Sequence, residues 1–180
     1  MRGSLACLCG ALLLVACNKP TVCTVPEPAN LWVQGSARLN PDPDGEPLPT
    51  LVRVYQVSNL GELEQATFEE MMRQPEDVLG ETLLATEEIT VYPGRSSFRG
   101  FERDPGANYV VGVAVVRQPS GNQWRTVLSM PGCMTKGGAR PMVRLMVDGY
   151  TIEGAINRDE DPQGCDQDDS ACLSARADAP

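Results

Sequence analysis

Histidine is absent from all 180 residues of the chain, and other residue types that carry chemistry are scarce. Without histidine the sequence lacks the commonest general base, the commonest zinc ligand and every nucleophile that depends on a Ser–His or Cys–His pair. Aromatic residues make up only 5% of the chain, which leaves few rings for stacking on a sugar. We find no catalytic motif, no cofactor-binding motif and no complete set of metal ligands, so the sequence predicts a protein that is not an enzyme.

Positive charge is also in short supply. Lysine and arginine together number 15 against 24 aspartates and glutamates, which gives a formal net charge of −9. An acidic chain of this kind is repelled by phosphate groups, both in nucleic acid and on an anionic bilayer. The composition therefore argues against a nucleic-acid partner and against direct adsorption to a membrane surface.

The first sixteen residues have the pattern of a secretory signal peptide. Arg2 precedes an apolar run from Leu5 to Ala16 that is too short to span a bilayer, and small residues end the run before Cys17. The order Leu14-Val15-Ala16-Cys17 resembles a bacterial lipobox, where the signal is cut and the cysteine receives a diacylglycerol. We expect residues 1–16 to be removed, which takes the formal charge from −9 to −10, and Cys17 to carry the lipid. An ordinary signal peptide followed by an incidental cysteine is the alternative.

Residues 17–28 are predicted to be a lipidated tether. Pro20, Pro26 and Pro28 favour an extended chain, which at about 3.1 Å per residue reaches on the order of 30 Å. In lipoprotein signals of this kind an aspartate after the cysteine usually retains the protein at the inner membrane. Asn18 in that position therefore favours the periplasmic face of the outer membrane.

Four cysteines remain once the signal is removed and Cys17 is acylated. An even number in an oxidising compartment predicts disulfides, with three possible connectivities. We favour a short loop closed between the last two, which leaves the first two to join the tether to a loop of the domain. A zinc site is the alternative, but it lacks both histidine and a CxxC pair. The four residues are Cys23, Cys133, Cys165 and Cys172.

Alternating apolar residues from position 31 onward predict a β domain over residues 29–156. Helical spacing interrupts the strands, because Thr67 and Glu70 form a capping-box pattern and Pro75 begins a second helical segment that ends near Gly80. The fold class is therefore all-β, an antiparallel eight-stranded β-sandwich with a short helical insertion between the second and third strands. The acidic residues 157–180 are predicted to be a disordered tail apart from the Cys165–Cys172 loop. The expected strands are 31–40, 50–57, 86–92, 95–101, 108–118, 123–130, 141–148 and 150–156.

A proline-rich, acidic connection occupies residues 41–49, between the first two expected strands. Because proline restricts the backbone, we expect this connection to project as a preformed acidic loop. Asn40, Asp42, Asp44 and Gly45 match positions 1, 3, 5 and 6 of a calcium-binding loop. Position 12, where a bidentate glutamate is needed, is Leu51, so calcium binding stays an alternative with an incomplete ligand set.

Four stretches of the chain, in order behind the lipobox, resemble one protein family. They are Asn40-x-Asp42-x-x-Gly45-x-Pro47-x-Pro49 with its continuation to Val57, then Phe68 to Leu79, then Glu87 to Gly94, then Tyr109 to Ala114 followed by Trp124-Arg125. Together they span roughly residues 29 to 150 and resemble the TssJ family, the outer-membrane lipoproteins of bacterial type VI secretion systems. The four additional cysteines and the acidic tail depart from the pattern of that family.

The resemblance implies a C2-like or transthyretin-like sandwich and a role as a membrane anchor. Proteins of this family bind the periplasmic C-terminal part of the inner-membrane protein TssM and so tie TssM, and indirectly TssL, to the outer membrane. The family uses the loop between the first two strands for that contact. The alternative function is a periplasmic solute-binding module for carbohydrate or calcium on a lipoprotein anchor. Carried over, the partner-binding loop consists of Asp42, Pro43, Asp44, Gly45, Glu46, Pro47 and Leu48.

Overall fold

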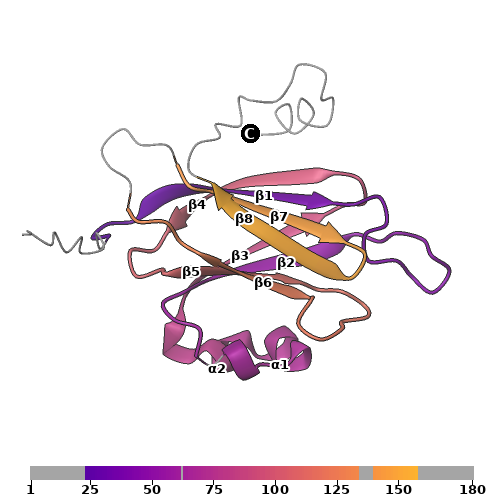
Figure 1. The fold of residues 1–180 in the computed structure, drawn as a ribbon, viewed down its shortest axis with the longest axis horizontal. Helices are drawn as coiled ribbons and strands as arrows, with labels where there is room; N and C mark the ends of the chain where they lie inside the picture. The colour runs from indigo at the N-terminus through magenta and orange to yellow at the C-terminus, as the bar shows by residue number, and fades with distance from the viewer. Residues whose placement is uncertain (1–22, 62, 134–139, 158–180) are drawn as a thin grey trace, which may run out of the picture.

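The computed structural model describes residues 23–61, 63–133 and 140–157, which form two facing four-stranded sheets (Figure 1). Sheet A has the strand order β4-β1-β7-β8 and sheet B the order β3-β2-β5-β6. A helical insertion joins β2 to β3. The strands are β1 (Glu27–Gly35), β2 (Thr50–Val57), β3 (Leu83–Val91), β4 (Ser96–Arg103), β5 (Tyr109–Ala114), β6 (Arg125–Ser129), β7 (Met142–Asp148) and β8 (Thr151–Asn157). The insertion consists of η1 (Leu63–Gln65), α1 (Phe68–Arg73), α2 (Pro75–Leu79) and η2 (Gly80–Thr82).

Sheet A is mixed, which corrects the prediction of a purely antiparallel sandwich. Strand β1 runs antiparallel to β4 but parallel to β7, with Leu31 opposite Val143 and Val33 opposite Leu145. All three pairings in sheet B are antiparallel, as expected. Side chains alternate in the same way in parallel and antiparallel strands, so the apolar pattern could not reveal this pairing.

The hydrophobic core lies between the two sheets. Leu31, Val54 and Leu145 are among its fully or almost fully buried side chains. Gly112 in β5 lies against Leu145 in β7, since a Cβ added to the glycine would come within 3.1 Å of the leucine Cδ1. Burial of each large aliphatic side chain contributes about 1.5–3 kcal/mol, so this layer holds the sheets together.

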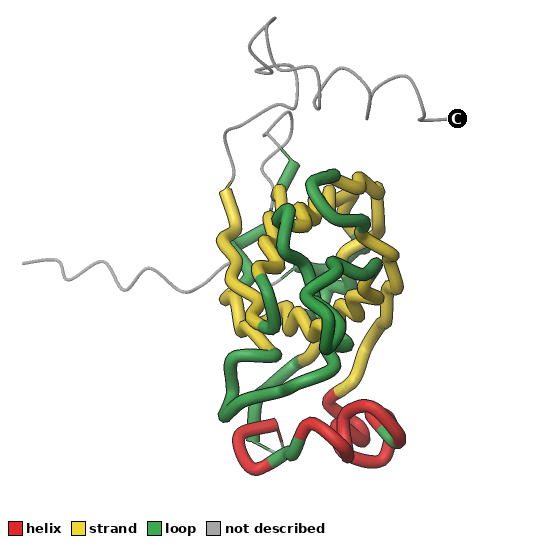
Figure 2. Tube along the Cα trace, turned by 90° about the vertical axis from the view of Figure 1, so that its right-hand side faces the viewer, coloured by secondary structure: helices red, strands yellow, loops and turns green. Residues whose placement is uncertain are grey.

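The helical insertion covers the outer face of sheet B (Figures 1 and 2). The predicted capping box is confirmed: the backbone N–H of Glu70 donates to Thr67 Oγ1 (3.3 Å), and the backbone N–H of Thr67 donates to Glu70 Oε2 (2.9 Å). Met71 and Leu79 are completely or almost completely buried, so the short helices are held by their apolar sides. Strand β2 is therefore covered on both faces, which explains its apolar residues at consecutive positions.

The first strand differs from its prediction at both ends. It stops at Gly35 rather than at residue 40, because the chain turns there and a Cβ on Gly35 would lie 2.7 Å from the backbone oxygen of Tyr92. Leu39 lies in the turn but is fully buried, so the apolar alternation continued past the end of the strand. At its start, β1 includes Glu27, which the sequence placed in the tether.

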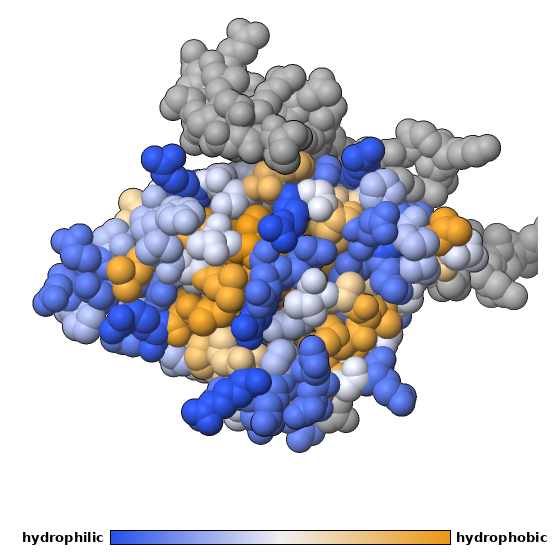
Figure 3. Space-filling model, turned by 180° about the vertical axis from the view of Figure 1, so that it is seen from behind, coloured by the Kyte–Doolittle hydropathy of each residue, from blue (hydrophilic) through white to orange (hydrophobic). Residues whose placement is uncertain are grey.

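One side of the sandwich leaves the edges of β3 and β4 open. Seen from behind, apolar side chains appear between the two sheets, whereas hydrophilic ones cover the helical insertion (Figure 3). Two polar contacts bridge the two strands here: Arg99 Nη1 donates to Glu87 Oε2 (3.5 Å), and Ser97 Oγ donates to the backbone oxygen of Thr90 (3.0 Å). Charged side chains along an open edge discourage pairing with other strands.

A disulfide joins Cys23 to Cys133, with their Cα atoms 5.3 Å apart. This is the pairing that the sequence favoured, and it attaches the segment before β1 to the segment after β6. Arg103, which is buried nearby, donates from Nη1 to the backbone oxygen of Pro131 (2.7 Å) and from Nη2 to that of Ala107 (3.1 Å). Both ends of the disulfide are thus held close to the sandwich.

Several predictions fall on residues that the structure does not describe. They are the signal peptide, the lipid attachment at Cys17, the Cys165–Cys172 pair and the acidic tail. Among the residues that are described, no helix is both long enough and apolar enough to cross a membrane.

Removing the Cys23–Cys133 disulfide should lower the stability of the domain. The bond closes a sequence separation of 110 residues, so its loss should increase the entropy of the unfolded chain and cost about 2–4 kcal/mol. The measurement is urea unfolding of the Cys23→Ser/Cys133→Ser double variant beside the unchanged protein. An equal free energy of unfolding would show that the cross-link does not stabilise the fold.

Candidate functional site

Four connections gather at one end of the sandwich, on the right in Figure 1 and facing the viewer in Figure 2. They are the β1–β2 loop, the β3–β4 turn, the β5–β6 loop and the β7–β8 turn. The segment that precedes β1 lies at the opposite end. The predicted partner-binding loop therefore belongs to a larger surface made of several loops, which we call the loop end.

Asp42 gives the predicted partner-binding loop its internal structure. Its Oδ1 accepts the backbone N–H groups of Asp44 and Glu46, both at 2.9 Å, and its own N–H donates to the backbone oxygen of Glu46 (2.9 Å). Gly45 has φ +89°, a left-handed conformation that favours glycine. Residues 42–48 thus form a tight turn, in which residues 43–46 are exposed and the other three half-buried.

Asn40 fixes this loop to its neighbours. It is only 5% exposed, and its Oδ1 accepts the backbone N–H of Arg117 in the β5–β6 loop (2.8 Å). Its own backbone N–H donates to the oxygen of Gly149 in the β7–β8 turn (2.8 Å). Tyr150 adds a bond from its hydroxyl to the backbone oxygen of Pro41 (2.8 Å). Three connections are therefore locked together before any partner arrives.

The geometry of the loop bears on the calcium alternative. Asp42, at position 3 of the motif, already uses one carboxylate oxygen for two backbone N–H groups. Within the described residues, three or more cysteine or carboxylate ligand atoms come together only at Cys23, Glu27 and Cys133. The two sulfur atoms of that group are joined in the disulfide and are not thiolates.

An exposed ion pair also braces the loop end. Arg38 donates from Nε to Asp148 Oδ1 (2.7 Å) and from Nη2 to Oδ2, which connects the turn after β1 to the end of β7. These bonds from Arg38, with a smaller contribution from Ser36, lower the pKa of Asp148 to about 2 from its ordinary 3.8. The carboxylate consequently stays ionised throughout the physiological range.

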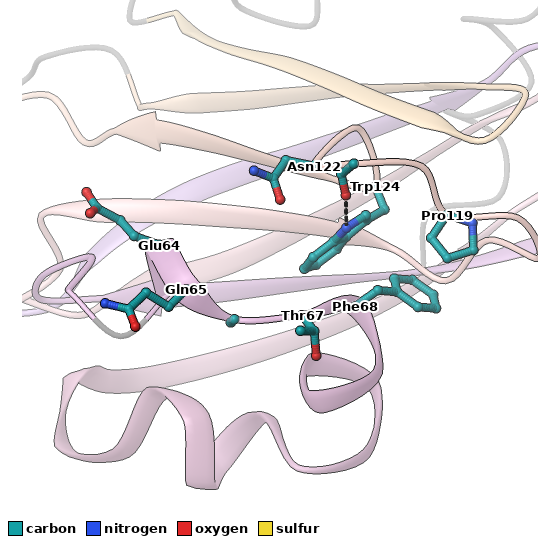
Figure 4. A pocket seen from close by; sticks show the side chains of 9 residues that line it. Glu64, Gln65, Thr67, Phe68, Pro119, Asn122 and Trp124 are labelled. Atoms are coloured by element: carbon teal, nitrogen blue, oxygen red, sulfur yellow. Dashed lines mark hydrogen bonds between the residues drawn. The ribbon is translucent and has the colours of Figure 1, made fainter.

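A groove of about 360 Å³ lies between the start of the helical insertion and the β5–β6 loop (Figure 4). Trp124 and Phe68 line it, with their ring centroids 5.4 Å apart in an edge-to-face arrangement. Trp124 Nε1 donates to the backbone oxygen of Gly121 (2.8 Å), the bond drawn in Figure 4. The other lining residues are Glu64, Gln65, Ala66, Thr67, Pro119, Gly121 and Asn122. The sequence did not predict this groove, because its two walls are far apart in the chain.

A second cavity, of about 250 Å³, lies between α1, α2 and the strands β2 and β3. Arg53 crosses it, with Nε donating to Glu88 Oε1 (2.8 Å) and Nη1 to the backbone oxygen of Met72 (3.1 Å). Burial raises the pKa of Tyr55, which lines the same cavity. Arg53 thus connects the helical insertion to sheet B, which is a structural role.

Comparison with known proteins gives one family and several solved structures. The family model described as type VI secretion lipoprotein, VasD, EvfM, TssJ matches residues 27–148. The structure of the type VI secretion lipoprotein TssJ1 from Pseudomonas aeruginosa is similar, with TM-score 0.64, 21% identity and coverage of 74% of this chain and 98% of that one. No curated protein sequence matches the chain.

Two further structures show the same fold. Serratia marcescens Lip, a membrane-bound component of the type VI secretion system, matches with TM-score 0.63 and 18% identity over 71% of this chain and 96% of that one. A chain of the structure titled "T6SS protein TssM C-terminal domain (869-1107) from EAEC" matches with TM-score 0.57 and 20% identity, over 72% of this chain and 98% of that one. At such identities the likeness concerns the fold alone.

Substitution of Asn40 should separate its two contributions. Asn40→Gly removes the acceptor for the Arg117 N–H and should cost about 1–2 kcal/mol. Asn40→Ala removes the same acceptor and also forces alanine into φ +43°, which should cost about 1 kcal/mol more. Asn40→Asp keeps an acceptor oxygen and serves as the control. Urea unfolding measures all three, and equal stability of the glycine and alanine variants would contradict the backbone contribution.

The Arg38–Asp148 pair predicts a pH dependence. Because the folded-state pKa of Asp148 is lowered to about 2, its stabilising contribution is complete above the ordinary value of 3.8 and is lost as pH falls through about 2. In the Arg38→Gln variant the pKa of Asp148 should rise toward 3.8, and acid unfolding should begin at higher pH. Carboxyl NMR titration measures the pKa directly. An unchanged titration of Asp148 in that variant would rule out Arg38 as the main cause.

Proposed function

The chain belongs to the type VI secretion lipoprotein family that includes TssJ, and from this premise we propose that it tethers the periplasmic C-terminal region of TssM to the outer membrane. The tether has two attachment points. One is the lipid on Cys17, and the other is the loop of residues 42–48. Through TssM the protein would also be connected to TssL.

The positions of the two attachment points carry this proposal. The segment that leads to Cys17 lies at one end of the sandwich, and the loop of residues 42–48 lies at the other (Figure 1). A protein held by its lipid would therefore present the loop to the periplasm, away from the membrane. The bonds of Asn40 and Asp42 give the loop a fixed shape, which lowers the entropy cost of binding.

The energetics suit a permanent anchor with a modest protein contact. Each buried methylene of an acyl chain adds roughly 0.8 kcal/mol, so the several chains of a mature lipoprotein hold it firmly in the bilayer. Confinement of both proteins to one compartment raises the effective concentration of the contact. An interface of ordinary strength would then be sufficient.

The structure titled for the TssM C-terminal domain adds support. Its matched chain is shorter than this one, since 72% of this chain covers 98% of it, whereas the titled segment 869–1107 is longer than this whole chain. We infer that the matched chain is a smaller protein of this fold that accompanies the TssM segment. An assembly of that kind is what the proposed function requires.

The solute-binding alternative has no specific observation in its favour. Trp124 is buried, and Trp32 is half-buried on β1 with the guanidinium of Arg144 5.7 Å from its ring centroid. Both tryptophans that could stack on a sugar are thus engaged in packing.

Replacement of residues 42–48 by a Gly/Ser loop of equal length should abolish binding of the full-length lipoprotein to the periplasmic C-terminal region of its cognate TssM. The Asp44→Lys/Glu46→Lys variant should weaken binding at least about tenfold, because both side chains are exposed at the tip of the loop. Affinity can be measured by biolayer interferometry, with circular dichroism to verify folding.

The matched control is Glu81→Lys/Glu153→Lys, which makes the same charge change at two exposed positions outside the loop. It should bind as the unchanged protein does. If the loop variants also bind normally, the anchoring role survives and the contact lies elsewhere. If the unchanged protein does not bind TssM, the proposed function itself is wrong.

A further inference from the structure

The groove beside Trp124 combines apolar walls with one carboxylate. Phe68 and Pro119 lie toward one side of Trp124, and Glu64 and Gln65 toward the other (Figure 4). Glu64 is the only charged residue among those that line the groove, and it is exposed. A groove of this kind fits a side chain with an aliphatic stem and a positive end, since the stem can pack on the rings while the cation meets the carboxylate.

The nearest cation of the protein does not occupy this groove. Arg125 stacks on Trp124, with its Cζ 5.1 Å from the ring centroid, but it does not line the groove. Its guanidinium donates to the backbone oxygens of Leu63, Ala66 (3.3 Å) and Glu64 (3.3 Å). The positive charge of Arg125 is thereby held against carbonyl groups of η1, and the side-chain carboxylate of Glu64 is left exposed.

The groove is continuous with the loop end. One of its walls, Pro119 to Trp124, belongs to the β5–β6 loop, and the same loop is bonded to Asn40 through the N–H of Arg117. The backbone oxygen of Gln123 accepts the N–H of Ile152 at the start of β8 (2.8 Å), which adds a second fixed connection. A partner that contacts the β1–β2 loop therefore meets a rigid surface that extends toward the groove.

The charges of this surface have one sign. The β1–β2 loop presents Asp44 and Glu46, and the groove presents Glu64. A partner that covers both sites would need basic groups to avoid leaving these carboxylates without counter-charges. Arginine suits the groove best, because its planar guanidinium can bond a carboxylate and stack on an aromatic ring.

We propose that the groove between Phe68 and Pro119 is a second contact of the TssM interface and receives an arginine or lysine side chain of TssM. The inference rests on the proposed function, and it adds the chemical class of the partner group. Glu64 then determines the preference of the groove for a positive group, and Phe68 and Pro119 supply the apolar contact.

The test compares Glu64→Lys with Glu81→Lys in the full-length lipoprotein, using the periplasmic C-terminal region of TssM as the probe. Both glutamates are exposed in the helical insertion, and only Glu64 lines the groove. Glu64→Lys should weaken binding at least about tenfold, Glu64→Gln by a smaller factor, and Glu81→Lys should have no effect. The weakening by Glu64→Gln should diminish at high salt, because it arises from an ion pair near the surface.

A photo-crosslinking residue in place of Asn122, on the rim of the groove, gives an independent measurement. It should couple to a TssM peptide that contains arginine or lysine, and the same residue at position 81 should not couple. Equal binding by Glu64→Lys and Glu81→Lys, with no crosslink from position 122, would overturn the groove contact while leaving the anchoring function intact. A crosslink to a peptide without a basic residue would overturn the assigned chemistry. If the unchanged protein fails to bind TssM, both the inference and the proposed function fall.

Discussion

Apolar packing between the two sheets is the constraint on which the rest of the structure depends. Gly112 leaves the space that Leu145 fills, and the buried valines and leucines around them fix one sheet over the other. Because both sheets are held in one orientation, the connections between strands are confined to the two ends of the sandwich. The end with the β1–β2 loop and the end with the N-terminal segment are thereby separated by the length of the strands (Figure 1).

That separation is what makes the fold suitable for an anchor. Tension between a lipid at one end and a partner at the other would act along the strands, through hydrogen-bonded sheets rather than through a flexible loop. The Cys23–Cys133 disulfide attaches the membrane side, while Asn40 and Tyr150 attach the loop side. Each attachment is made by a few well-placed contacts, and the sheets between them supply the rigidity.

Local features of the fold were predicted well and distant contacts were not. The bounds of β2 and the capping box of α1 agree with the sequence, because both depend on residues close together in the chain. The end of β1 was wrong because Leu39, buried in a turn, imitates a strand residue. The parallel pairing of β1 with β7 and the joining of Phe68 to Trp124 left no mark in any local pattern.

The sequence by itself determined the class of the protein: a lipobox-like signal, a β domain interrupted by a helical insertion, and an acidic, proline-rich loop in a family-like context. These are properties of neighbouring residues, which repeat with the period of a strand or a helix. Only the tertiary structure decided that Asn40 reaches Arg117, that sheet A is mixed and that a groove opens beside Trp124. Those contacts depend on how the sheets pair and stack, which is settled by packing across the whole core.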